Sequence, residues 1–333
     1  MITKIINSND LSAAADCLKC GGTVVFPTET VYGLGADALN PDAIKKIYKA
    51  KGRPSDNPLI IHISSESDIS KLSNNITPGA KLLMENFWPG PLTLIVKKSS
   101  IVPDEVTAGL DTVAVRFPSN DIACRLIKQS GVFVAAPSAN LSGSPSPTVC
   151  EDVISDLNGR VDYIIDGTGC EIGLESTVVD VSGDEVIILR PGGITLEMIQ
   201  SIIPSAKLDG GLIDDSTTPK CPGLKYRHYA PRAKVVVVQG NKNNVKKYIS
   251  SQIKLNSKIG VMTYGGGEYA DADVVIDVGS TMEEYAHNLF SALRMFDKKS
   301  VDFIYAEFCV EDGMGVAVRN RLYKASGHNI IEV

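Results

Sequence analysis

The chain has 333 residues, of which 44% are hydrophobic and 22% are charged, and its formal net charge is -6. This composition is typical of a soluble globular protein, and the length predicts two domains of about 150 residues each. No apolar run reaches the roughly 18 residues that a membrane helix needs, and the first residues lack the apolar stretch of a signal peptide. We therefore expect a cytoplasmic protein with no membrane partner.

The charge is unevenly distributed along the chain. Residues 1–200 carry 16 Lys and Arg against 24 Asp and Glu, whereas residues 201–333 carry 17 against 15. A protein that binds long nucleic acids usually has a broad positive surface, which neither part predicts. The seven cysteines form no disulfide framework. Cys17 and Cys20 form a CxxC pair, but a zinc site would need a second pair or a nearby histidine.

Helices and strands alternate over residues 1–204. Helices are predicted near 8–21, 40–52, 77–87, 122–131, 150–158 and 195–203, and strands near 23–26, 59–63, 92–96, 112–117, 133–136, 161–165, 177–181 and 185–190. Residues 27–35 are predicted to form a polar loop with glycine turns. The pattern indicates one α/β domain with a mixed sheet.

The second part of the chain begins with an aperiodic stretch. Residues 205–233 are rich in Gly, Pro, Asp and Thr, which predicts a linker. Its last part, 221–231, has too many aromatic and basic residues for a plain tether, so we expect it to dock on a folded surface. From residue 234 strands alternate with helices again, which predicts a small parallel α/β domain over 234–333.

Polar residues collect at the two connections of the stretch 22–63. The loop at 27–35 follows a buried strand directly, where α/β sheets bind ligands, and it contains Thr30. The alternative is a polar loop with no ligand. Residues 33–38 also fit G-x-G-x-x-A, but the expected helix begins only after Asn40, so this dinucleotide fingerprint is weak.

Four cations occur beside Ser, Thr or Asn at loops or strand ends of an otherwise acidic domain: Lys51, Arg53, Arg116 and Arg190. Together they predict a local anion site for a nucleotide, because a long nucleic acid would need a wider basic surface. Two of these cations have a plainer alternative. Lys51 could complement a helix C-terminus, and Arg116 could form an internal ion pair. His62 could be a core histidine.

Six motifs occur in an order that resembles a known family: FPTETVYGLG, KAKGRPSDNPL, VAVRFP, APSANLSG, ESTVVD and ILRPG. They are similar to those of the threonylcarbamoyl-AMP synthases with a YrdC-like fold. PGLKYRHYAP and the segment ending in GVAVRNRLYKAS resemble the linker and the extra C-terminal domain of the long form. The resemblance implies a mixed twisted sheet with a concave cleft over 1–204, a linker at 205–233 that folds over the active site, and a small Rossmann-like parallel domain over 234–333.

The resemblance also implies a reaction. A nucleotidyltransferase of this family makes threonylcarbamoyl-AMP and pyrophosphate from L-threonine, bicarbonate or CO₂, and ATP with Mg²⁺. A downstream enzyme then transfers the threonylcarbamoyl group to an adenosine of tRNA, so that tRNA is only an indirect partner.

The same resemblance implies roles for single residues. Lys51 and Arg53 are expected to be catalytic. Matching positions hold L-threonine at Thr30, His62, Arg116, Ala136 and Ser176. Matching positions hold ATP at Arg53, Asn57, Thr112, Ser138, Asn140, Ser146, Arg190 and Tyr226. No metal ligand is expected from the protein's own side chains.

Two other functions remain open at this point. A non-catalytic protein that binds double-stranded RNA or tRNA could use the same concave surface, but it should have a positive first domain. A carbamoyl-transfer module of hydrogenase maturation would share the YrdC-like fold, but it would carry acylphosphatase and zinc-finger segments that this sequence does not show.

Overall fold

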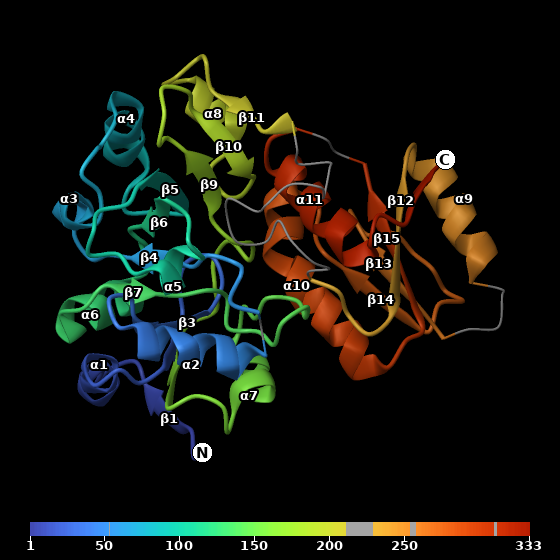
Figure 1. Cartoon of the computed structure of the whole chain (residues 1–333). Coiled ribbons are helices and arrows are strands. Elements are labelled where there is room, and N and C mark those ends of the chain that lie inside the picture. Colours follow the sequence, from blue (N-terminus) through green and yellow to red (C-terminus); the bar gives the residue numbers. More distant parts are fainter. Residues whose placement is uncertain (53, 211–228, 254–257, 310–311) are drawn as a thin grey trace. The chain divides into compact units, whose positions relative to one another are not determined.

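The computed structural model describes residues 1–52, 54–210, 229–253, 258–309 and 312–333 (Figure 1). The chain divides into two compact units. The first comprises Met1–Ser142, Pro147–Glu171 and Glu175–Lys225, and the second comprises Gly143–Ser146, Ile172–Leu174 and Tyr226–Val333. Two short segments from the N-terminal part of the chain therefore belong to the second unit.

A mixed sheet forms the first unit, which confirms the predicted fold class. Over the described residues its order is β1-β8-β2-β3-β7-β4-β6-β5-β9-β10-β11. The strands are β1 (Lys4–Asn7), β2 (Val24–Phe26), β3 (Gly33–Asp37), β4 (Ile60–His62), β5 (Leu92–Lys97), β6 (Thr112–Arg116), β7 (Val134–Ala135), β8 (Tyr163–Asp166), β9 (Thr177–Asp180), β10 (Ile187–Arg190) and β11 (Lys207–Leu208). The sheet contains parallel pairs such as β4 with β6 and antiparallel pairs such as β5 with β6.

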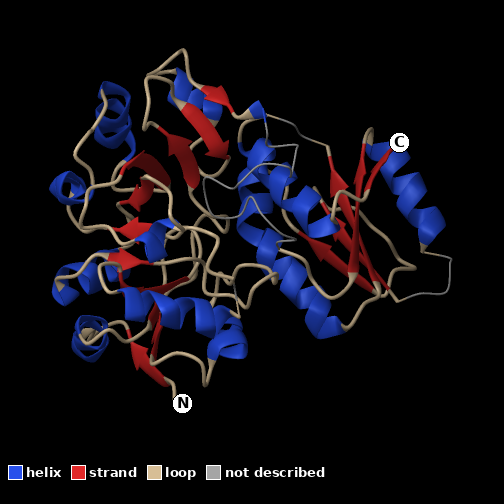
Figure 2. Ribbon diagram, in the orientation of Figure 1, coloured by secondary structure: helices blue, strands red, loops and turns tan. Residues whose placement is uncertain are grey.

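Helices cover both faces of this sheet (Figure 2). The helical segments are α1 (Ser12–Lys19), α2 (Pro41–Lys51), η1 (Glu66–Asp68), α3 (Ile69–Leu72), α4 (Pro78–Phe87), α5 (Asp104–Thr107), α6 (Asp121–Ser130), α7 (Cys150–Leu157) and α8 (Leu196–Gln200). On one face, α1 and α6 pack against β2, β7 and β8. The larger core, with α2, α4 and α7, occupies the other face.

One part of the first face is built from strand residues alone. Ile60, Ile95, Ala114, Val178 and Leu189 form a separate buried cluster from β4, β5, β6, β9 and β10. Side chains on a strand alternate between faces, so Ile60 shares its face with residue 62, and Ala114 shares its face with residues 112 and 116. The predicted His62 and Arg116 therefore lie on the same face as this cluster.

The prediction of a polar loop over 27–35 is wrong for its last part, because Gly33–Asp37 form β3, which pairs with β2 and β7. The reason is packing. A Cβ at Gly35 would lie 2.6 Å from Cγ1 of Val134 and 2.7 Å from Cε1 of Phe26. Glycine thus permits a close strand contact here, although its low strand propensity conceals the strand in the sequence. The G-x-G-x-x-A pattern at 33–38 is part of this strand.

The second unit contains a parallel sheet in the order β14-β13-β15-β12-β16, as predicted for the C-terminal domain. Its strands are β12 (Lys234–Gln239), β13 (Ile259–Thr263), β14 (Val274–Asp277), β15 (Phe303–Phe308) and β16 (Ile330–Glu332). Its helices are α9 (Lys242–Gln252), α10 (Met282–Lys299) and α11 (Met314–Ser326). Figures 1 and 2 show α9 on one face of this sheet and α10 and α11 on the other.

The two segments from the N-terminal part are held inside the second unit. Arg294 of α10 donates from Nε to the carbonyl oxygen of Pro145 over 3.1 Å. A Cβ at Gly173 would lie 2.4 Å from the carbonyl oxygen of His287, so this backbone packs directly on α10. The residues that follow the undescribed part of the linker also pack here. The ring of Tyr229 stacks on Phe290 with 5.1 Å between centroids.

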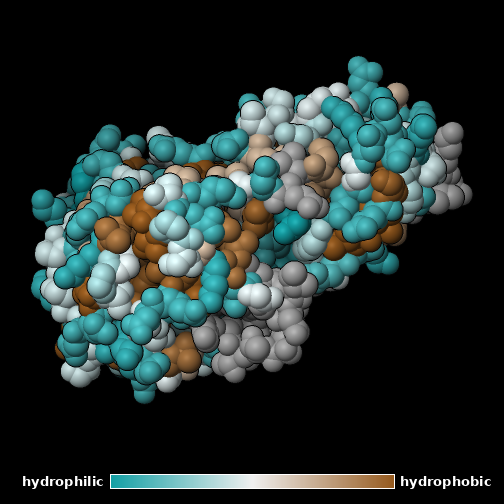
Figure 3. Space-filling view, turned by 90° about the horizontal axis from the view of Figure 1, so that it is seen from above, coloured by the Kyte–Doolittle hydropathy of each residue, from teal (hydrophilic) through white to brown (hydrophobic). Residues whose placement is uncertain are grey.

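The surface mixes polar and apolar residues. Seen from above, hydrophobic patches lie among hydrophilic residues on both units (Figure 3). No helix within the described ranges is long and apolar enough to cross a membrane.

Candidate functional site

His62 and Arg116 are the last residues of two neighbouring parallel strands. In the register of β4 and β6 they are direct partners, and both side chains are buried. The carboxyl ends of parallel strands meet at one edge of a sheet, so these two polar residues, which the sequence places at the ends of separate strands, lie together there.

Arg116 starts a hydrogen-bond chain that runs in one direction. Its NH1 donates to Oγ1 of Thr30 over 2.8 Å, and Oγ1 of Thr30 lies 2.8 Å from Oγ1 of Thr28. The hydroxyl of Thr28 donates to the carbonyl oxygen of Val31. Because that proton is used, the proton between the two threonines must come from Thr30. The hydroxyl of Thr30 can therefore only accept a further hydrogen bond.

Arg116 has an acidic partner that was not predicted from the sequence. An oxygen of the buried Glu29 carboxylate, Oε1, lies 2.7 Å from NH2 of Arg116. Burial is the largest single influence on Glu29 and opposes its ionisation. The charge and hydrogen bonding of Arg116, together with the backbone amides of Glu29 and Ser119, outweigh burial and lower the pKa of this carboxyl. The internal ion pair that was an alternative for Arg116 is therefore present, and it lies within the predicted site. The sequence did contain one indication of this partner, because an arginine buried within an apolar strand needs an anion nearby.

His62 is uncharged at neutral pH. Burial and the neighbouring Arg116 lower the pKa of its imidazole to about 3. Nδ1 lies 3.1 Å from the carbonyl oxygen of Ile60, a contact that favours the tautomer with the proton on this nitrogen. His62 thus offers a neutral polar ring beside the Arg116 guanidinium.

Ser176 and Arg190, predicted from two different motifs, are in direct contact. Arg190 donates from Nε to the carbonyl oxygen of Ser176 over 3.0 Å and from NH2 to its hydroxyl over 3.1 Å. The same hydroxyl lies 2.7 Å from that of Thr93 in β5, which the sequence analysis did not single out. Thr93 is also the register partner of Arg116. Thr93 and Ser176 thereby connect the surroundings of Arg116 with Arg190. Another predicted residue, Ala136, follows β7, and its backbone amide donates a hydrogen bond to the carbonyl oxygen of Ile60 on β4.

Lys51 is buried at the end of α2 and binds a distant loop. Its ammonium donates to the carbonyl oxygens of Ser138 and Asn140 and to Oδ1 of Asn140, at 2.7 Å for the Asn140 carbonyl and 3.3 Å for its side chain. The predicted neighbours Lys51, Ser138 and Asn140 therefore do lie together. The backbone of Asn57, which is also buried, accepts from the hydroxyl of Tyr48 over 3.0 Å.

Four predicted residues do not take part in the contacts described above. Thr112 begins β6 whereas Arg116 ends it, so about 13 Å separates them at roughly 3.3 Å per residue. Ser146 is buried and belongs to the second unit. Arg53 and Tyr226 lie outside the described residues, as does most of the predicted linker.

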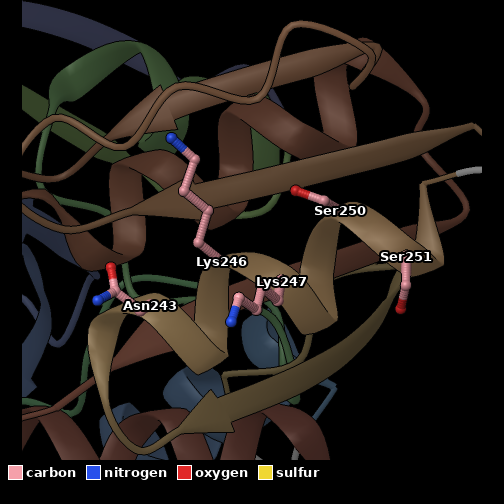
Figure 4. Close-up of a pocket in the computed structure, with 5 residues that line it drawn as sticks. All are labelled: Asn243, Lys246, Lys247, Ser250 and Ser251. Atoms are coloured by element: carbon pink, nitrogen blue, oxygen red, sulfur yellow. The ribbon is translucent and has the colours of Figure 1, made fainter.

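One hollow on the second unit contains none of the residues predicted to bind substrate. This hollow of about 590 Å³ runs along α9, lined by Asn243, Lys246, Lys247, Ser250 and Ser251 (Figure 4). All five side chains come from α9 alone. Within the described ranges, no three His, Cys, Asp or Glu side chains are placed to hold a metal ion.

Comparison with known proteins identifies the family. Residues 16–192 match the family model described as "Telomere recombination", and residues 194–327 match "Threonylcarbamoyl-AMP synthase, C-terminal domain". The chain is 50% identical to the threonylcarbamoyl-AMP synthase of Pyrococcus abyssi, over 96% of this chain and 95% of that protein. It is 47% identical to that of Bacillus subtilis, over 99% and 97%. The chain belongs to the threonylcarbamoyl-AMP synthase family.

A solved structure agrees with this family assignment. The crystal structure of P. abyssi Sua5 in complex with L-threonine matches with a TM-score of 0.96 and 48% identity, over 99% of this chain and 100% of that one. Both family models are present in order, so this threonylcarbamoyl-AMP synthase has the long form with the additional C-terminal domain.

Proposed function

We propose that this enzyme makes threonylcarbamoyl-AMP and pyrophosphate from L-threonine, bicarbonate or CO₂, and ATP, for the modification of tRNA. The observation that carries the proposal is the buried group of Arg116, Thr30 and His62 at the ends of β4 and β6. The crystallised relative with bound L-threonine supports the same substrate.

The side chains suit a free amino acid. The guanidinium of Arg116 is a strong partner for the α-carboxylate, because charged hydrogen bonds to carboxylates are among the strongest in proteins. Thr30 can accept a hydrogen bond from the substrate hydroxyl, since its own proton is directed to Thr28. His62 stays neutral and adds no second positive charge.

The nucleotide would lie near Arg190 and the loop that Lys51 holds. The threonine ammonium group first loses a proton to solvent, and the free amine attacks CO₂ and releases a second proton. The resulting carbamate then attacks the α-phosphorus of ATP, with pyrophosphate as leaving group. Carbamate and triphosphate are both anionic, so their approach is the main electrostatic obstacle. Arg190, Arg53 and Lys51 supply positive charge, and Lys51 also fixes the backbone of Ser138 and Asn140.

Mg²⁺ has no candidate site of its own within the described part of the chain. We propose that it enters with the triphosphate of ATP, as is usual for phosphoryl and nucleotidyl transfer. The linker residue Tyr226 is proposed to cover the bound nucleotide and to exclude water from the reactive intermediates. A Tyr226→Ala variant should then release more pyrophosphate per threonylcarbamoyl-AMP recovered than the wild type does, because more of the product is hydrolysed.

The proposed product is a mixed anhydride that hydrolyses readily in water. A second enzyme must therefore accept its threonylcarbamoyl group and transfer it to an adenosine of tRNA. The alternative of a non-catalytic protein that binds RNA is not favoured, because the relatives named above are synthases.

Pyrophosphate release tests the proposed function. The purified chain is incubated with ATP, Mg²⁺ and bicarbonate, together with each of several amino acids in turn. We expect release that prefers L-threonine and that is lost in Arg53→Ala and in Arg116→Ala. Release without a preference for L-threonine would count against the assignment.

A further inference from the structure

Glu29 and Arg116 form a buried pair whose hydrogen-bonding capacity is incompletely used. Their side chains are each 4% exposed, and Oε1 of Glu29 lies 2.7 Å from NH2 of Arg116. Within the described residues the two oxygens of Glu29 and NH2 of Arg116 make no hydrogen bond of good geometry, although Arg116 and the backbone amides of Glu29 and Ser119 lie near enough to favour the ionised carboxylate. Buried polar groups normally have such partners, so this pair is suited to receive a polar ligand.

The neighbouring titratable groups leave the pair in charge balance. Burial raises the pKa of Cys124 to about 11 and that of Cys170 to about 12, and His62 is neutral. None of these three groups adds charge at neutral pH. One positive and one negative side chain thus face each other in a site with little solvent, where charge interactions are strong.

A ligand must match this balance. A simple carboxylate would bind Arg116 but would bring a second negative charge close to Glu29. A zwitterionic α-amino acid brings one charge of each sign, so its ammonium group offsets the repulsion between its carboxylate and Glu29. Specificity then arises partly from a repulsive element built against the wrong ligand.

We propose that Glu29 determines the charge selectivity of the threonine site in the initial binding step, so that, before carbamoylation, the free site binds a zwitterionic α-amino acid more tightly than a carboxylate without an ammonium group. The proposal rests on the proposed binding of L-threonine at Arg116. It gives a function to a residue that the expected substrate contacts leave unassigned.

Binding measurements on two ligands test the role of Glu29. Isothermal titration calorimetry compares L-threonine with (R)-3-hydroxybutanoate, which keeps the carboxylate, hydroxyl and methyl groups but lacks the amine. The wild type should bind L-threonine at least about tenfold more tightly. In Glu29→Gln this preference should fall at least about tenfold, and Glu29→Asp should keep most of it. The exposed Glu151 on α7 supplies the matched control, because Glu151→Gln removes one negative charge elsewhere.

Each outcome decides the proposal. An unchanged preference in a folded Glu29→Gln, with pyrophosphate release still dependent on threonine, overturns the role of Glu29 and leaves the proposed function intact. Failure of the wild type to bind L-threonine overturns both. If Glu29→Gln does not fold, the ligand preferences of the wild type and of Glu29→Asp still test the proposal. Equal binding of both ligands by the wild type, or a preference lost in a folded Glu29→Asp, contradicts the proposal.

Discussion

The neutral state of His62 makes the stability of the first unit depend on pH. The pKa of this histidine is about 3 in the folded protein, against about 6.5 in an unfolded chain. Between these values the unfolded chain binds a proton that the folded chain does not bind. The stabilising contribution is therefore complete above pH 6.5 and is lost as the pH falls below it, by about 1.4 kcal/mol per unit. From pH 7.5 to pH 5.0 the loss amounts to about 2 kcal/mol.

The chain contains a single tryptophan, Trp88, which is buried in the first unit and reports on that unit alone. Urea unfolding followed by its fluorescence gives the free energy of unfolding at both pH values. The same measurement on His62→Gln subtracts the contribution of all other titrating groups. We expect the wild type to lose about 2 kcal/mol more than the variant over this interval. Proton NMR provides a second measurement, in which the His62 ring should not titrate between pH 5 and pH 8.

Equal losses in wild type and variant would refute this reasoning. So would a His62 resonance that titrates near pH 6.5, because it would show that neither burial nor Arg116 governs the imidazole.

Three further substitutions test the packing around the site, each by the same tryptophan-monitored unfolding. Lys51→Met should cost about 2–4 kcal/mol, because two buried carbonyl oxygens of a distant loop lose their donor. Gly35→Ala should cost about 1–3 kcal/mol through overpacking between β2 and β7. Thr93→Val should cost about 1–2 kcal/mol and raise the KM for ATP, because the hydroxyl of Ser176 that contacts Arg190 loses a partner.

Matched controls accompany the first two substitutions. Lys49→Met changes an exposed lysine of the same helix and should leave the free energy of unfolding within about 0.5 kcal/mol of the wild type. Gly183→Ala places a methyl group in open space and should likewise be nearly neutral. A loss as large in the control as in its partner would contradict the packing argument. For Thr93→Val, an unchanged KM for ATP would contradict the proposed connection to Arg190.

Local signals predicted most of the fold. For α2, the side chain of Asn40 caps the first turn, Pro41 occupies the first helical position, and Gly52 ends the helix with a left-handed backbone. Each of these features is visible in the sequence. β1 and β16 are short strands that the sequence analysis did not predict, and β11 lies where a linker was expected. Such short strands depend on a neighbour for their pairing, which local patterns do not contain.

The site was predictable only in part, for the same reason. His62 and Arg116 could be predicted from the sequence, because each is a polar residue at the end of an apolar strand pattern. The partners of these residues are remote in sequence: Lys51 reaches a carbonyl 87 residues away. Glu29 stands next to Thr30, yet its ion pair with Arg116 depends on two strands that only the folded sheet brings together.

The second unit takes Gly143–Ser146 and Ile172–Leu174 from the middle of the first unit's sequence. The chain therefore passes between the two units several times, and no single cut separates them. A fragment ending near residue 204 would leave Pro145 without Arg294 and Gly173 without the backbone of α10. Loss of activity in such a fragment would not by itself reveal a role for the linker. A relative that dispenses with the C-terminal domain must support these two loops in another way, so the gain or loss of this domain requires changes inside the first one.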